Sequence, residues 1–190
     1  MGLNLPNLLT WGRIVLIPML LIVYYLPERW IPEHGQNVIA AGIFIVAAIT
    51  DWLDGYLARH LKQTSSFGAF LDPVADKLMV ATALLLLVAL DNVAAFIAAI
   101  IIGREIAISA LREWMAKIGE SRSVAVSFVG KLKTTAQMVA ISLLLYNDRL
   151  WFIDAHLVGT WLIYAAAILT LWSMVYYMRK ALPLAREAMK

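Results

Sequence analysis

Four aspartates in two neighbouring apolar stretches of the sequence have the type and spacing to bind metal ions. Asp51 and Asp54 lie near the end of the first stretch, and Asp72 and Asp76 lie near the start of the next. On an α-helix, with 3.6 residues per turn, each pair falls on one face, so each helix would present an acidic stripe. Small residues on the same faces would clear space beside the carboxylates; these are Gly55, Ala58 and Gly68. We interpret the four aspartates as one site.

A group of carboxylates within a membrane requires compensation of its charge. Each carboxylate at the bilayer centre costs about 2.5 to 3.5 kcal/mol, and only Arg59, Lys62 and Lys77 are basic residues close by in the sequence. Two divalent cations would neutralise the cluster, and ligands that are all oxygen favour Mg²⁺, Mn²⁺ or Ca²⁺ over zinc. The chain has no cysteine, which excludes disulfides, a thiol nucleophile and a zinc-thiolate site. The alternative is that the acids only mark the ends of two helices.

A second polar group consists of basic residues within or beside apolar stretches. Arg104 lies well inside one stretch, and Glu105 and Arg112, seven residues apart, fall on nearly the same helix face. Lys131 and Lys133 project about 200° apart on a helix, so both can face one point only if the backbone there is irregular. An arginine within a membrane helix favours a functional role, and a structural pairing with Glu105 is the alternative.

The elements that must position these residues are membrane helices. The chain has 190 residues, of which 62% are hydrophobic and 15% charged, far from the balance of a soluble domain. A bilayer core about 30 Å thick needs roughly 20 apolar residues per helix. We predict an all-α integral membrane protein, a single domain over residues 1–190, with six transmembrane helices near residues 8–26, 38–58, 69–90, 93–111, 124–146 and 157–178.

The basic residues predict the orientation of these helices. Of the 16 Lys and Arg, all except Arg29 and Arg149 fall on the side that holds both termini. The positive-inside rule places that side, with the aspartates, at the cytoplasm. Residues 1–10, with Pro6 suited to a helix start, are expected to form a short interfacial helix or an extended lead-in. Pro18 and Pro73 either kink their helices or begin them.

Aromatic residues gather near the predicted helix ends. Tyrosine and tryptophan favour the headgroup region of a bilayer, where the ring is buried and the polar atom is hydrated. We interpret this group as interfacial anchors: Tyr24, Tyr25, Trp30, Tyr146, Trp151, Phe152, Tyr176 and Tyr177. The net charge of +3 includes no basic tail, so nothing indicates binding to nucleic acid.

The spacing of the aspartates resembles a known signature. The pattern D-x2-D-G-x2-A-R-x8-G-x3-D-x3-D, from Asp51 to Asp76, is that of the CDP-alcohol phosphatidyltransferases, and every fixed position matches. Three outer blocks resemble the bacterial phosphatidylglycerophosphate synthases of that family: Asn7-Leu-Leu-Thr10-x2-Arg13, Arg104-Glu105-x3-Ser109-x2-Arg112-Glu113 and Gly130-Lys-Leu-Lys133-Thr134-x2-Gln137.

The resemblance implies a homodimer in the bacterial inner membrane, with a polar cavity open to the cytoplasm. It implies transfer of a phosphatidyl group from CDP-diacylglycerol to glycerol 3-phosphate, with two Mg²⁺ or Mn²⁺ ions as cofactors. Asp76 would accept the acceptor's proton. The metal ligands would be Asp51, Asp54, Asp72 and Asp76; the CDP-diacylglycerol site would comprise Thr10, Arg13, Gly55, Ala58, Arg59, Ser65 and Gly68; and the glycerol 3-phosphate site would comprise Arg104, Arg112, Lys131 and Lys133.

Two other functions remain open from the sequence. The same chemistry could use another acceptor, namely an inositol phosphate, serine or phosphatidylglycerol, because basic residues indicate a phosphate without identifying its alcohol. Buried acids also line cation pathways, so a divalent-cation transporter is the alternative from a different class. All four aspartates lie towards one side of the predicted membrane, which favours the enzyme.

Overall fold

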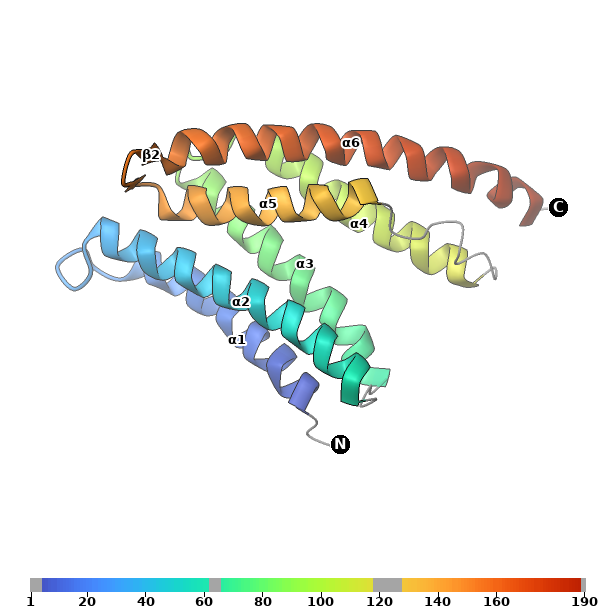
Figure 1. Cartoon of the computed structure of the whole chain (residues 1–190), viewed down its shortest axis with the longest axis horizontal. Coiled ribbons are helices and arrows are strands. Elements are labelled where there is room, and N and C mark those ends of the chain that lie inside the picture. Colours follow the sequence, from blue (N-terminus) through green and yellow to red (C-terminus); the bar gives the residue numbers. More distant parts are fainter. Residues whose placement is uncertain (1–4, 62–65, 118–127, 189–190) are drawn as a thin grey trace.

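Six helices and one short hairpin make up the fold. The structure, a computed structural model, describes residues 5–61, 66–117 and 128–188. The helices are α1 (Leu5–Tyr25), α2 (Glu33–Leu61), α3 (Ser66–Ala89), α4 (Ala95–Lys117), α5 (Phe128–Tyr146) and α6 (Ala155–Ala188). Strands β1 (Arg149–Leu150) and β2 (Ile153–Asp154) pair antiparallel between α5 and α6. The all-α class predicted from the apolar stretches is therefore confirmed (Figure 1).

Each predicted membrane segment overlaps one helix, and residues 124–127 of the fifth segment lie outside the described residues. Three helices are long and apolar enough to cross a membrane by length and composition: Leu8–Tyr25, Glu33–Leu53 and Ala155–Arg179. With 34 residues, α6 is about 51 Å long at 1.5 Å per residue, well beyond a core about 30 Å thick. Its C-terminal turns therefore extend past the apolar segment. A count of six membrane crossings stays a prediction.

Residues 5–10 of the predicted N-terminal segment belong to the first helix, and residues 1–4 lie outside the described residues. α1 begins at Leu5, so Pro6 stands in its first turn, where a missing N–H is tolerated. Pro18 lies inside α1 and Pro73 lies inside α3, so neither proline begins its helix.

The hairpin between α5 and α6 was not predicted. Its turn places Trp151 at a φ of 59°, in the left-handed region, and leaves Trp151 and Phe152 almost fully exposed. Such exposure suits the interfacial anchors expected there. Asp154 then caps α6, because its Oδ1 accepts a hydrogen bond of 3.0 Å from the Leu157 amide.

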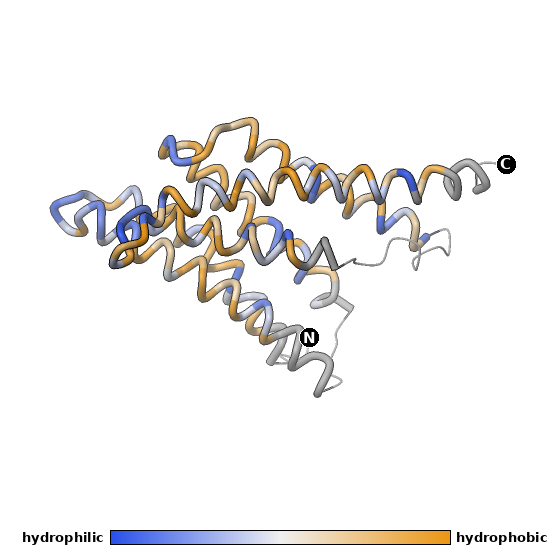
Figure 2. The backbone as a smooth tube through the Cα atoms, turned by 45° about the horizontal axis from the view of Figure 1, so that its top comes forward, coloured by the Kyte–Doolittle hydropathy of each residue, from blue (hydrophilic) through white to orange (hydrophobic). Residues whose placement is uncertain are grey.

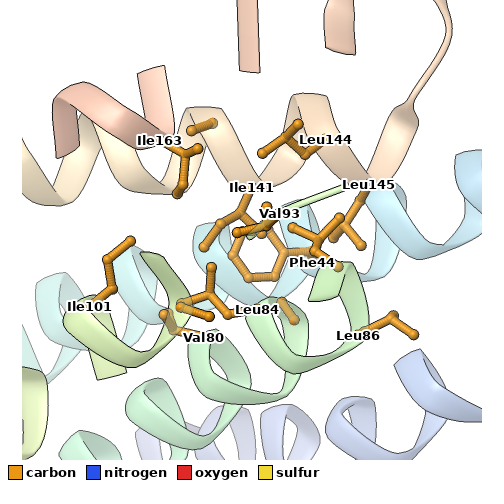
Figure 3. Packing of buried hydrophobic residues seen from close by; sticks show 14 of the residues in the cluster. Phe44, Val80, Leu84, Leu86, Val93, Ile101, Ile141, Leu144, Leu145 and Ile163 are labelled. Atoms are coloured by element: carbon orange, nitrogen blue, oxygen red, sulfur yellow. The ribbon is translucent and has the colours of Figure 1, made fainter. Parts of the chain in front are cut away.

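A continuous apolar core joins the helices. Phe44 of α2, Leu84 of α3, Ile101 of α4 and Ile141 of α5 are fully buried, and they pack together in one cluster with Ile163 of α6 (Figure 3). This cluster fixes the distance between helices that carry the polar residues.

Helices α5 and α6 approach closely at Gly159. A Cβ added at Gly159 would meet the Leu144 Cγ at 2.8 Å and the Ala140 carbonyl oxygen at 3.2 Å. Small residues allow such close approach of membrane helices. Gly159 is therefore required by the packing of α6 against α5.

Three of the connections between helices lie at one end of the molecule. The segments that join α1 to α2, α3 to α4 and α5 to α6 lie at the same end in Figure 1. The N-terminal ends of α1 and α3 and the C-terminal ends of α4 and α6 lie towards the opposite end. Hydrophilic stretches interrupt several otherwise apolar helices (Figure 2).

Candidate active site

The acidic part of the site is held by an arginine from α1. Arg13 Nη1 lies 2.9 Å from Asp51 Oδ1, which joins α1 to α2. The Arg13 side chain is 1% exposed, whereas that of Asp51 is 44% exposed. A buried guanidinium requires a carboxylate or equivalent partner, and Asp51 supplies it. The structure thus brings Arg13, predicted to bind the donor, to one of the predicted metal ligands.

A second contact from the same helix reaches α3. The Thr10 hydroxyl donates a hydrogen bond to Asp72 Oδ1, and Thr10 is 1% exposed. Thr10 and Arg13 are three residues apart, so they share one face of α1. One face of α1 therefore holds an aspartate from each of the two acidic stripes.

Asp76 is the last of the predicted aspartates along α3. It stands one turn after Asp72 on α3 and is partly buried. The charges of Asp51 and Arg13 act on its carboxylate, as do those of Glu105 and Lys77. Asp76 is therefore within electrostatic reach of both the acidic residues and α4.

The basic part is organised around Glu105, which was not among the predicted site residues. Lys133 of α5 donates a hydrogen bond to Glu105 Oε1, and Arg104 Nη1 lies 3.3 Å from the same oxygen. Lys133 is 1% exposed and Arg104 is 7% exposed. Both the functional and the pairing interpretations of Arg104 thus remain compatible with its surroundings. The sequence feature that could have identified Glu105 is its place next to Arg104, in one of the blocks that resemble the family.

Helix α6 contributes two further residues that sequence reasoning missed. Arg104 Nη2 donates a hydrogen bond of 2.9 Å to Ser173 Oγ. The Tyr177 ring centroid lies 5.9 Å from the Cζ of Arg104 and 5.6 Å from that of Arg112. Tyr177 is 1% exposed, so its interpretation as an interfacial anchor is wrong. The available signal was a polar stripe, Thr170, Ser173 and Tyr177, at helical spacing in an apolar helix.

Several buried polar atoms in the described part of the chain lack a hydrogen-bond partner. They include the Nε atoms of Arg104 and Arg112 and the Oε1 atom of Gln137. A buried donor without a partner costs about 1 to 3 kcal/mol. A phosphate oxygen would satisfy such a guanidinium N–H, since arginine binds phosphate through directed N–H groups.

The predicted aspartates fit a hard divalent cation in donor type. Asp51, Asp72 and Asp76 offer only carboxylate oxygens, and all three are accessible to some degree. Among the described side chains, no three acidic or histidine residues already converge at metal-binding distance. The Asp54 side chain lies outside the described residues, so the structure does not test the four-aspartate site.

Other predicted residues also lie outside the description. Nothing is described for the side chains of Gly55, Ala58, Arg59, Ser65 and Lys131. Gly68 is described and is buried near the start of α3. Lys131 and Lys133 were expected to project in different directions from a regular helix. The structure describes the side chain of Lys133, which is buried.

The chain is similar to known proteins along nearly its whole length. Residues 3–172 match the family model described as CDP-alcohol phosphatidyltransferase. A protein of Salmonella choleraesuis (strain SC-B67) is 51% identical over 183 residues, covering 95% of this chain and 96% of that protein. A protein of Escherichia coli (strain K12) is 51% identical over the same length, with the same coverage. Both are named CDP-diacylglycerol–glycerol-3-phosphate 3-phosphatidyltransferase.

Proposed function

Because the chain belongs to the CDP-alcohol phosphatidyltransferases, we propose that it transfers the phosphatidyl group of CDP-diacylglycerol to glycerol 3-phosphate. The products are phosphatidylglycerophosphate and CMP. The observation that carries this function is that α1 holds a carboxylate of α2 and one of α3, while bases of α4 and α5 are buried together at Glu105. The names of the similar bacterial proteins support glycerol 3-phosphate as the acceptor.

The acidic part of the site would hold the donor through divalent metal ions. Their proposed ligands are Asp51, Asp54, Asp72 and Asp76, and oxygen donors of this kind suit Mg²⁺ or Mn²⁺. When bound, such ions neutralise charge on the pyrophosphate and make the attacked phosphorus more electrophilic. Thr10 and Arg13 hold Asp72 and Asp51 in position. The remaining donor contacts are proposed for Gly55, Ala58, Arg59, Ser65 and Gly68.

Asp76 is proposed as the general base. It would accept the proton of the glycerol 3-phosphate hydroxyl while that oxygen forms a bond to the β-phosphorus. The bond between this phosphorus and the oxygen of CMP breaks in the same displacement, and CMP leaves with the bonding electrons. The place of Asp76 on α3, one turn after Asp72 and partly buried, supports this role.

The basic part would bind the phosphate of the acceptor. Arg104 and Lys133 are buried, and both pair with Glu105. Arg112, on the same helix as Arg104, contacts the Tyr177 ring. A guanidinium can bind phosphate with two hydrogen bonds, and a lysine adds a point charge. Lys131 is proposed at this site from the sequence alone.

The site is proposed to face the cytoplasm of a bacterial cell. The positive-inside distribution places both termini on that side of the inner membrane, and the apolar helices α1, α2 and α6 support membrane insertion. Assembly as a homodimer is proposed from the family resemblance.

The identity of the acceptor is tested by product analysis. Purified protein receives CDP-diacylglycerol and Mg²⁺ with glycerol 3-phosphate, serine, an inositol phosphate or phosphatidylglycerol in separate reactions, and the lipid product is identified by mass. We expect product with glycerol 3-phosphate. Product only with one of the other acceptors would contradict the acceptor assignment while leaving phosphatidyl transfer intact.

A further inference from the structure

Tyr177 contacts two guanidinium groups that come from one helix. Arg104 and Arg112 both lie on α4, eight residues apart, and the Tyr177 ring from α6 lies within 6 Å of the Cζ of each. The face of an aromatic ring attracts a cation electrostatically, and the attraction is stronger where water is excluded. Tyr177 is 1% exposed, so both contacts are formed away from solvent.

The two arginines need such a partner because they repel each other. The charge of Arg112 acts unfavourably on both Arg104 and Lys133. Arg104 and Lys133 share one carboxylate, that of Glu105, so with Arg112 the group carries more positive than negative charge. An aromatic ring reduces this repulsion without adding a negative charge that would compete with an incoming phosphate.

Ser173 fixes the direction of one guanidinium. Its hydroxyl donates a hydrogen bond of 2.9 Å to the Thr170 carbonyl oxygen and accepts one of 2.9 Å from Arg104 Nη2. Since the hydroxyl proton is engaged by the helix backbone, the Ser173 oxygen remains available as an acceptor. Ser173 is 2% exposed, so water does not compete readily.

These contacts occupy specific atoms of Arg104 and leave another available. Glu105 engages Nη1 and Ser173 engages Nη2, whereas Nε has no hydrogen-bond partner among the described atoms. The Nε of Arg112 is also buried without such a partner in the described part of the chain. Unsatisfied donors at two arginines held by one ring indicate a site arranged for an anion.

We propose that Tyr177 and Ser173 of α6 are positioning residues that hold Arg104 and Arg112 for the phosphate of the acceptor. This role rests on the proposed function, in which these arginines bind glycerol 3-phosphate. α6 thereby contributes to acceptor affinity without itself contacting the acceptor.

Tyr177 also packs in a small apolar cluster with Ile108, Met115 and Ala181, so a purely structural role must be distinguished. The test compares Tyr177→Phe, which keeps the ring face, with Tyr177→Leu, which keeps an apolar side chain and removes the ring. Ser173→Ala removes the hydrogen bond to Arg104. Trp172→Leu is the matched control, because Trp172 is an aromatic residue of α6 that is 72% exposed.

Steady-state kinetics are measured with each substrate varied in turn. We expect Tyr177→Leu to raise the KM for glycerol 3-phosphate about tenfold and Ser173→Ala to raise it about threefold, with the KM for CDP-diacylglycerol unchanged. Tyr177→Phe should remain close to the parent protein, as should Trp172→Leu. A merely structural role would not raise the KM for glycerol 3-phosphate while leaving the KM for CDP-diacylglycerol unchanged.

Three results would overturn the proposal. They are an unchanged KM for glycerol 3-phosphate in Ser173→Ala, equal changes in both KM values in Tyr177→Leu, and an effect of Tyr177→Phe as large as that of Tyr177→Leu. If Tyr177→Leu does not fold, Ser173→Ala and Tyr177→Phe decide the question. Failure of the proposed function is separate, because the parent protein would then not use glycerol 3-phosphate at all.

Discussion

At the scale of single residues, the described polar side chains form an acidic group and a basic group. Arg13 and Thr10 hold carboxylates of the acidic group, and Glu105 holds two cations of the basic group. In each case a buried side chain contacts a residue of another helix and, for Arg104, also its sequence neighbour. The positions of these polar side chains therefore depend both on helix packing and on the pairing of opposite charges.

Glu105→Gln tests the arrangement of the basic group. The substitution removes the negative charge that Lys133 and Arg104 share, while it keeps a hydrogen-bonding oxygen. We expect a lower midpoint of thermal unfolding in detergent and a lower rate of product formation, because two buried cations lose their common counter-ion. The measurement is thermal unfolding together with the initial rate.

Glu113→Gln is the matched control for this change. Glu113 pairs with Lys117 at 3.0 Å on the same helix, but both side chains are 71% exposed. Exposed pairs contribute little to stability. Equal effects of the two substitutions would contradict a special role for Glu105.

The aspartates could be predicted from the sequence, whereas the contribution of α6 could not. Regular spacing between Asp51 and Asp76 places acids on helix faces without knowledge of the tertiary structure. Ser173 and Tyr177 are ordinary residues near the end of a membrane helix, and only the packing of α6 against α4 brings them to Arg104. Tyr177 was therefore mistaken for an anchor.

At the scale of elements, apolar length predicted the helices better than it predicted their ends. α4 continues to Lys117 and α6 to Ala188, beyond the predicted 93–111 and 157–178. Charged residues end a hydrophobic stretch without ending a helix, since Glu, Lys and Arg are good helix formers. The hairpin was missed because its four strand residues and two-residue turn are too short to give a periodic signal.

Gly159→Ala tests the packing of α5 against α6. The added Cβ would lie 2.8 Å from the Leu144 Cγ and 3.2 Å from a backbone oxygen, which cannot move independently of its helix. Overpacking of this kind costs about 1 to 3 kcal/mol. We expect a lower midpoint of thermal unfolding in detergent.

Gly42→Ala provides the control for that substitution. A Cβ at Gly42 would have no neighbour within 4 Å, and alanine favours a helix over glycine. The control should unfold at the same temperature as the parent protein or higher. If Gly159→Ala behaved in the same way, the close contact between α5 and α6 would not exist as described.

At the scale of the whole molecule, the helix connections and the site occupy different regions. The described connections between helices gather at one end (Figure 1), and they contain Arg29 and Arg149, the two basic residues predicted on the outer side. The resemblance and the basic residues together predict a site reached from the cytoplasm. The four-aspartate site and the homodimer remain predictions at this scale.

Single cysteines test the orientation of the molecule. The chain has no cysteine, so each variant carries one label site without further changes. We expect cysteines at His34 or Trp151, at the end that holds the connections, to react with a membrane-impermeant reagent in intact cells. Cysteines at Glu113 or Lys117 should react only after the cells are opened. The reverse pattern would contradict the orientation.

The central claim is that carboxylates on α2 and α3 and bases on α4 and α5 form one site for metal-dependent transfer to glycerol 3-phosphate. The most direct measurement is CMP release from CDP-diacylglycerol by the purified protein, with and without glycerol 3-phosphate and Mg²⁺, for the parent, Asp72→Asn and the control Asp91→Asn. We predict CMP release only with both additions, a loss of about two orders of magnitude or more in Asp72→Asn, and none in Asp91→Asn. CMP release that persists after chelation of metal, or a parent-like rate in Asp72→Asn, would contradict the account.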